Sequence, residues 1–147
     1  MKKIFIYYSL NGSGDKVASI LMTKGIDIRK VIADYKVSKS NFSMIMKGGF
    51  LAGINYKAKL IDFNDDINAY DEVIIGSPIW NNRFSCPINT VLSKLDLTGK
   101  KLTFILYSAS GKENKAMKKI NKLYPDAEII NLKEPKELET IPELDNL

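Results

Sequence analysis

The chain contains no histidine, and Cys86 is the only cysteine among its 147 residues. Without histidine it lacks the side chain most often used for acid–base chemistry near neutral pH, and also a common zinc ligand. A single cysteine cannot form an intrachain disulfide, which argues against a disulfide-stabilised secreted scaffold. We therefore expect a cytoplasmic protein without a metal centre, in which any redox chemistry comes from a bound cofactor.

Long hydrophobic runs are missing as well. The first apolar segment, residues 4–8, follows Lys2 and Lys3 directly and is too short for a membrane span or the core of a signal peptide. We therefore expect no membrane span, no signal peptide and no membrane partner. The length and a hydrophobic content of 45% predict a single domain over residues 1–147. A domain of this size buries roughly 70% of its unfolded surface.

Acidic residues are scarce in the first part of the chain. Residues 1–60 carry 11 basic and 3 acidic residues, a net charge of +8, whereas residues 61–147 carry 11 and 14, a net charge of −3. The basic residues are scattered, without a Lys/Arg run or interleaved aromatics, so we expect no nucleic-acid partner. Solvated lysines on the first two helices explain the pattern, although a basic surface can also attract acidic partners.

The segment from Ile4 to Ala18 is the most informative part of the chain. Residues 4–8 form an uninterrupted apolar run, as is typical of a strand buried on both faces of a parallel sheet. A polar turn follows, Ser9-Leu10-Asn11-Gly12-Ser13-Gly14, and then residues with helical spacing. Glycines allow backbone N–H groups to close around an anion, and the start of a helix attracts negative charge. The segment therefore predicts a phosphate-binding turn.

The turn matches neither the dinucleotide-binding pattern GxGxxG nor the Walker pattern, because no Lys-Ser or Lys-Thr pair follows the glycines. It resembles the flavodoxin loop Thr/Ser-x-Thr-Gly-x-Thr, which wraps the phosphate of FMN. Asn11 stands in place of the middle threonine and Gly14 in place of the last, so one hydroxyl donor is missing, for which Ser13 can compensate. An ordinary turn rich in serine and glycine is the alternative.

A second buried strand ends in Gly76-Ser77-Pro78-Ile79-Trp80 and continues into a polar run. This segment resembles the GxPIW loop of the flavodoxin family, which borders the isoalloxazine ring. The resemblance implies that the ring is lined by Pro78, Ile79, Trp80, Asn81 and Asn82. We interpret Trp80 as an exposed aromatic at the mouth of the site, with a core or dimer-interface tryptophan as the alternative. Pro87 then opens a helix, where its missing N–H costs nothing.

A third strand, Lys101–Tyr107, opens into Ser108-Ala109-Ser110-Gly111 before a helix over Lys115–Leu123. In the resembling family this loop contacts the other edge of the flavin, mainly through its backbone. Taken alone, it is equally well explained as a plain strand-to-helix connection. The order and spacing of all three loops favour a flavin site.

The strand pattern predicts the fold class. Apolar runs begin near Ile4, Ile28, Val73, Leu102 and Ala127 and alternate with helical or irregular segments. Right-handed crossovers then give a three-layer, doubly wound α/β fold, with five parallel strands in the order 2-1-3-4-5. Flavodoxin itself is the standard example of this order, and its ligand lies beyond the carboxyl ends of strands one and three.

The segment Ser38–Leu60 is the least regular. Phe42, Ile45, Met46 and Phe50 share one helical face, and Gly48-Gly49 interrupts it. We interpret this segment as a core-packing amphipathic helix, with a flap near the flavin ring as the alternative.

The C-terminal segment departs from the resembling family, in which a full helix follows the fifth strand. Here Glu134–Leu147 is broken by Pro135 and Pro142. We expect a shortened helix and an irregular tail that shield part of the sheet. Any apolar patch left uncovered is a candidate interface, for example in a homodimer.

Together these features predict an FMN-binding, flavodoxin-like electron-transfer protein. Its partners would be redox proteins or small-molecule electron acceptors. One alternative is an FMN-dependent oxidoreductase that uses NAD(P)H to reduce quinones or other small acceptors. Another alternative is a binding module that has lost its flavin. The glycine at position 14, where the family has threonine, leaves this alternative open. We expect Cys86 to be a buried structural thiol, since no second cysteine or histidine is present to assist it.

Overall fold

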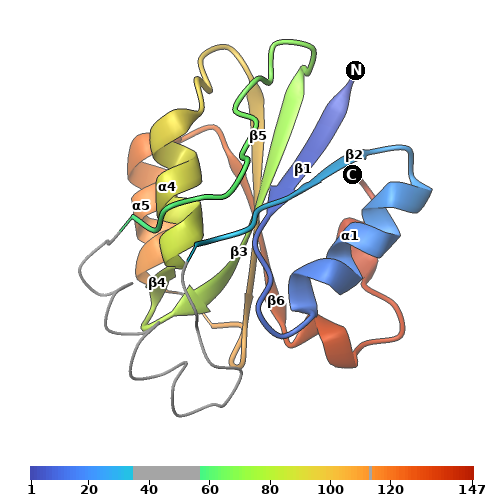
Figure 1. Ribbon diagram of the computed structural model, residues 1–147. Helices are drawn as coiled ribbons and strands as arrows, with labels where there is room; N and C mark the ends of the chain where they lie inside the picture. Colours follow the sequence, from blue (N-terminus) through green and yellow to red (C-terminus); the bar gives the residue numbers. More distant parts are fainter. Residues whose placement is uncertain (35–56, 113) are drawn as a thin grey trace.

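The computed structural model describes residues 1–34, 57–112 and 114–147. A central sheet contains five parallel strands in the spatial order β2-β1-β3-β5-β6 (Figure 1). The strands are β1 (Lys3–Tyr7), β2 (Asp27–Lys30), β3 (Glu72–Trp80), β5 (Lys101–Ser108) and β6 (Glu128–Lys133). A two-residue strand, β4 (Arg83–Phe84), pairs antiparallel with the end of β3. Counted along the chain, the parallel strands have the predicted order 2-1-3-4-5, which confirms the doubly wound flavodoxin-like fold.

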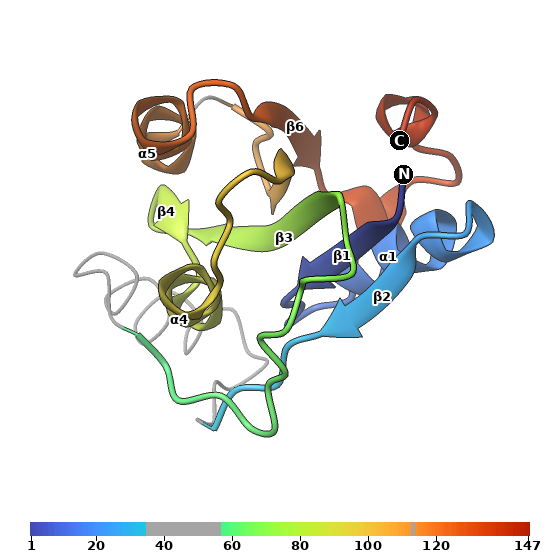
Figure 2. The same cartoon turned by 90° about the horizontal axis from the view of Figure 1, so that it is seen from above.

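Helices cover both faces of the sheet, giving three layers (Figures 1 and 2). Helices α4 (Cys86–Lys94) and α5 (Lys115–Leu123) lie on one face, and α1 (Ser13–Thr23) lies on the other. Alternate residues of each strand point to opposite faces. In β1, Ile4 and Ile6 therefore belong to the core under α4 and α5, whereas Phe5 belongs to the core under α1. No helix in the described ranges is long and apolar enough to cross a membrane.

Helices α4 and α5 begin where the sequence predicts, whereas α1 begins at Ser13, inside the predicted turn, so that Ser13 and Gly14 belong to its first turn. Helix α5 has the predicted bounds, and the Asn114 side chain caps it by accepting a hydrogen bond from Met117 N at 3.0 Å. Helix α4 follows Ser85, with Pro87 in its first turn. The amphipathic helix predicted around Phe42 and Phe50 lies outside the described residues.

The C-terminal tail replaces a full helix with two short 3₁₀ helices, η2 (Pro135–Glu137) and η3 (Pro142–Leu144). Ile141 and Leu144 are 3% and 0% exposed and pack into the core beside α1. Leu138 is 40% exposed. The expected short helix and irregular tail are thus present, and they cover the sheet face on which a full helix would otherwise pack.

We expect Leu144→Ala to lower the free energy of unfolding by about 2–5 kcal/mol, the usual cost of a cavity at a buried leucine. Leu138→Ala changes the same tail at an exposed position and should cost about 0.5 kcal/mol. Urea denaturation of the two variants measures the difference. Equal losses would show that the tail does not form part of the core.

Candidate cofactor site

The turn after β1, the end of β3 and the loop after β5 meet at the carboxyl edge of the sheet and line a cavity of about 490 Å³. Its size falls within the range of small-molecule and cofactor sites. The lining residues come from all three predicted loops and from the tail. They are Leu10, Asn11, Ser13, Pro78, Ile79, Trp80, Tyr107, Ser108, Ala109, Glu134 and Lys136. The tail residues Glu134 and Lys136 were not predicted, because nothing in the sequence links them to the loops.

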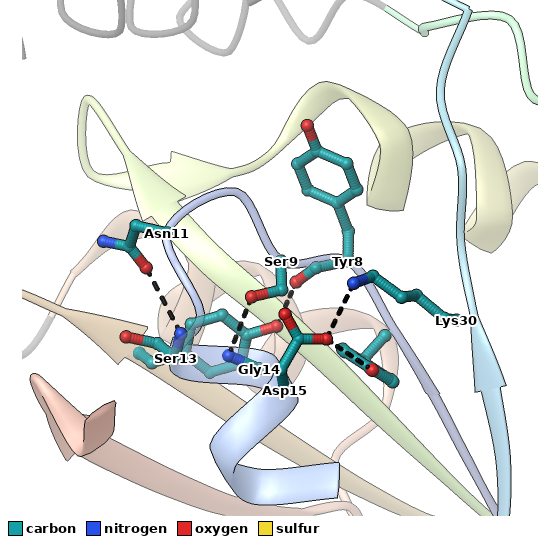
Figure 3. A network of polar contacts seen from close by, with 9 residues as sticks. Tyr8, Ser9, Asn11, Ser13, Gly14, Asp15 and Lys30 are labelled. Carbon is teal, nitrogen blue, oxygen red and sulfur yellow. Dashed lines mark hydrogen bonds and ion pairs between the residues drawn. The ribbon is translucent and has the colours of Figure 1, made fainter. Parts of the chain in front are cut away.

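The first loop is held by its own polar side chains (Figure 3). The Gly14 N–H donates to Ser9 Oγ at 3.1 Å, and the Ser13 N–H donates to Asn11 Oδ1 at 3.3 Å. Gly12 precedes α1 with a φ of 98°, a left-handed conformation that glycine adopts readily. The turn therefore folds directly onto the positive end of α1.

These hydrogen bonds leave unused donors in the turn. Asn11 and Ser13 line the cavity, whereas the predicted site residues Ser9, Gly12 and Gly14 do not line it. The Ser9 oxygen acts as an acceptor, so its O–H remains a donor, and the Asn11 amide nitrogen remains a donor in the same way. Ser13 is 5% exposed and lines the cavity, a position from which its hydroxyl can compensate for the missing threonine. Together with the start of α1, these groups form a turn suited to a phosphate group.

The structure explains why glycine stands at position 14. A Cβ atom there would lie 2.6 Å from Tyr107 Oη, 2.7 Å from Tyr7 Cδ2 and 2.9 Å from Ser9 Cβ. The Tyr107 hydroxyl, which donates to the Tyr8 carbonyl oxygen, occupies the space that a side chain at position 14 would need. The missing threonine therefore reflects packing against β5. Sequence reasoning missed Tyr107, since this contact joins positions far apart in the chain.

Asp15 ties the start of α1 to two strands. Its Oδ1 accepts hydrogen bonds from Tyr7 Oη and from Lys30 Nζ, both at 2.8 Å (Figure 3 shows Lys30). Partial burial raises the pKa of Asp15, but the hydrogen bonds from Lys30 and Tyr7 outweigh burial and hold the pKa below its usual value. Burial and the Asp15 carboxylate together raise the pKa of Tyr7. At neutral pH the carboxylate is thus charged and balanced by Lys30.

The expectation for Trp80 is partly wrong. Its side chain lines the cavity, but it is only 6% exposed and belongs to the core under α4 and α5. The ring meets Tyr8 edge to face, with centroids 5.8 Å apart. The reason is that β3 continues through Trp80 and pairs with β4, so Trp80 lies within the sheet instead of in a loop at the mouth.

Asn81 and Asn82 form the two-residue turn between β3 and β4. Their φ values are 47° and 68°, as a tight hairpin turn requires, and asparagine tolerates this conformation. The Asn82 side chain accepts a hydrogen bond from Lys115 N at 3.3 Å and lines a second cavity of about 320 Å³ beside the first. Asn81 is exposed and lines neither of these two cavities.

The third loop is held by side chains from two strands. The Gly111 N–H donates to Ser108 Oγ at 2.9 Å. Asn131 Nδ2 donates to the carbonyl oxygens of Gly111 and Lys112 at 2.7 and 2.9 Å. Ser108 and Ala109 line both cavities, and Ser110 lines the second. Gly111 lines neither and instead shapes the loop, while Asn131 was not predicted.

Cys86 is buried with no exposed area, as expected, and burial raises the pKa of its thiol to about 11. The thiol therefore stays protonated and unreactive at neutral pH. Within the described ranges, no three Cys, Asp or Glu side chains are grouped so that they could hold a metal ion.

A doubly wound sheet with a phosphate-type turn at the winding reversal defines the flavodoxin-like class of proteins. A family model described as Flavodoxin matches residues 2–147, and the chain belongs to this family. No sequence among the curated proteins is similar enough to match it.

Solved structures share the fold at low sequence identity. A candidate flavoprotein from Bacteroides uniformis ATCC 8492 superposes with a TM-score of 0.71 and 18% identity, covering 92% of this chain and 93% of its own. One from Bacteroides eggerthii DSM 20697 gives a TM-score of 0.68 and 20% identity, with coverages of 92% and 91%. A flavoprotein from Lactobacillus acidophilus NCFM, solved in complex with FMN, gives 0.66 and 20%, with coverages of 88% and 89%.

We expect Gly14→Ala to lower the free energy of unfolding by about 1–3 kcal/mol, because the added methyl group overpacks the contact with Tyr107. In a Tyr107→Phe background the same substitution should cost at least about 0.5 kcal/mol less, since the hydroxyl is gone. Urea unfolding of the four proteins in this cycle measures the coupling. Tyr124→Phe, at the end of α5, provides the control background and should show no coupling. Additive effects with Tyr107→Phe would contradict the packing argument.

Proposed function

We propose that this protein binds FMN noncovalently and transfers electrons between redox partners. The observation that carries the proposal is that the turn after β1, the end of β3 and the loop after β5 converge around one cavity, and that the turn after β1 is of the phosphate-binding type. The family and the FMN complex of the Lactobacillus acidophilus neighbour support FMN as the cofactor. We further propose a cytoplasmic location, which rests on the composition alone.

The residues at the cavity fit the two ends of FMN. Asn11 and Ser13 from the lining, with the neighbouring Ser9 and the start of α1, would hold the phosphate. Pro78, Ile79 and Trp80 provide apolar lining and are candidates to hold the isoalloxazine ring and exclude water from it. Backbone groups of Ser108 and Ala109, which line the same cavity, would set the hydrogen bonds of the ring. When bound, FMN supplies the redox chemistry, so the chain needs to provide only position and electrostatics.

Two alternatives from the sequence now carry different weight. The glycine at position 14, where the family has threonine, left the loss of flavin open; the contact with Tyr107 offers a packing reason for that glycine and so weakens the argument for lost binding. A stand-alone oxidoreductase is favoured by one observation, the second cavity of about 320 Å³ next to the first. That cavity has room for a small electron acceptor.

We expect FMN to bind at least about tenfold more tightly than riboflavin, since hydrogen bonds to a charged group contribute about 1.5–3 kcal/mol each. Titration followed by flavin fluorescence measures both affinities. Ser9→Ala should bring the affinities for FMN and riboflavin closer together, whereas replacing Ser19, an exposed serine on α1, by alanine should leave the ratio of the two affinities unchanged. Equal binding of both flavins, or binding of neither, would show that the phosphate-loop assignment is wrong.

A second experiment separates the carrier from the oxidoreductase. The FMN-loaded protein should show negligible steady-state turnover of NADH or NADPH with a quinone when no reductase is present. The reason is that the described part of the chain offers no second nucleotide-phosphate turn beside the cavity. Quinone reduction is followed by the loss of absorbance of the reduced nicotinamide. Rapid turnover by the protein alone would assign it to the oxidoreductases.

A further inference from the structure

Helix α5 presents a row of lysines to the solvent. Lys115, Lys118, Lys119 and Lys122 follow the i, i+3, i+4, i+7 spacing of one helix face, and we call them the α5 lysine stripe. Lys115, Lys118 and Lys122 are exposed. On the opposite side of the helix, Ala116 and Ile120 are buried against the sheet.

Within the described ranges, no ion pair neutralises the positive charge of the α5 lysine stripe. The ion pairs of those ranges involve other lysines, such as Lys30 with Asp15 and Lys3 with Glu72, and none includes a lysine of the stripe. Burial lowers the pKa of Lys119, and the positive charge of Lys57 lowers it further, so like charges gather here. Lys119 Nζ lies 5.7 Å from the centre of the Phe84 ring instead of beside a carboxylate.

The arrangement also opposes the stability of the helix. Like charges three and four residues apart repel one another, and a cation in the first turn opposes the helix dipole. The first turn of α5 holds Lys115 and no acidic residue. A solvated helix face that mixes positive and negative charges avoids this loss of stability. Proteins tend to break such local rules at functional sites, so a row of positive charges alone is typical of a binding surface.

The α5 lysine stripe begins at the edge of the candidate site. Lys115 N donates to Asn82 Oδ1, and Ala116 N donates to the Asn82 carbonyl oxygen at 3.2 Å. Asn82 lines the second cavity together with Lys112 and Asn114. From there α5 runs along the outside of the sheet, beside β4 (Figures 1 and 2). A protein docked on the stripe would therefore lie next to the site.

We propose that the α5 lysine stripe, extended by Lys112 and Lys57, docks the acidic surface of a redox protein that exchanges electrons with the bound cofactor. This inference rests on the proposed function. Each exchange moves one electron from the reduced centre of one protein to the oxidised centre of the other, and no bond forms or breaks. Among the described residues no aromatic side chain is prominently exposed to stack on bases, so the surface favours a protein over a nucleic acid.

The test uses an acidic [2Fe–2S] ferredoxin as the probe and isothermal titration calorimetry at low ionic strength, on both the flavin-free and the FMN-loaded protein. Lys115→Glu/Lys118→Glu should weaken binding by about tenfold or more, and it places an acid where the helix dipole favours one. The control is Lys24→Glu/Lys94→Glu, which changes the net charge equally. In this control, Lys24 directly follows α1 and Lys94 is the last residue of α4. Both are exposed, and these two helix ends lie at the edge of the sheet away from the site.

Binding by the wild type and the control, but not by the stripe variant, supports the proposal. Equal weakening in both variants would reduce the effect to net charge and overturn it, as would a wild type that binds duplex DNA but not the ferredoxin. Because docking is also measured without flavin, a failure to bind FMN appears in the flavin titration alone and is distinguishable from a failure of docking.

Discussion

The close contact between helix α1 and the ends of β1 and β5 is the constraint on which the site depends. Position 14 has room for a hydrogen atom only, because Tyr107, Tyr7 and Ser9 surround it. This contact sets how near the start of α1 comes to the sheet, and so where its first N–H groups lie. The Tyr107 hydroxyl donates a hydrogen bond to the Tyr8 carbonyl oxygen, which fixes its position in this contact.

The turn after β3 and the loop after β5 are each held in place by their own hydrogen bonds. Asn82 joins the turn after β3 to the start of α5, and Asn131 secures the loop after β5. An asparagine side chain thus anchors each of these two segments, from within the turn after β3 and from the neighbouring β6 for the loop after β5. The cavity wall is therefore built on strands and helices, which hold a site in place better than free loops do.

Local patterns were sufficient to predict the fold. The alternation of apolar runs with helical segments predicted the five strands, right-handed crossovers predicted their order, and the helical spacing after the polar residues before Lys115 predicted α5. Of the site, only the parts defined by short local motifs could be predicted, and these are the three segments that follow or end the first, third and fourth predicted strands. Contacts between distant positions were not, which is why Tyr107, Lys30 and Asn131 were missed and why Trp80 was expected at the surface. Burial depends on how far β3 continues and what it pairs with, and a short motif does not contain that information.

The hydrogen bonds from Gly14 to Ser9 and from Ser13 to Asn11 give the first loop its shape from the chain alone. The turn is thus preorganised, and little conformational entropy has to be lost when a ligand enters. Cofactor loading then does not have to wait for local folding, and apoprotein can accumulate and be filled later. Under these conditions the cofactor stabilises the protein by mass action, in proportion to the logarithm of its free concentration. The extent of loading would therefore follow the supply of flavin in the cell and would not depend on the folding history of the chain.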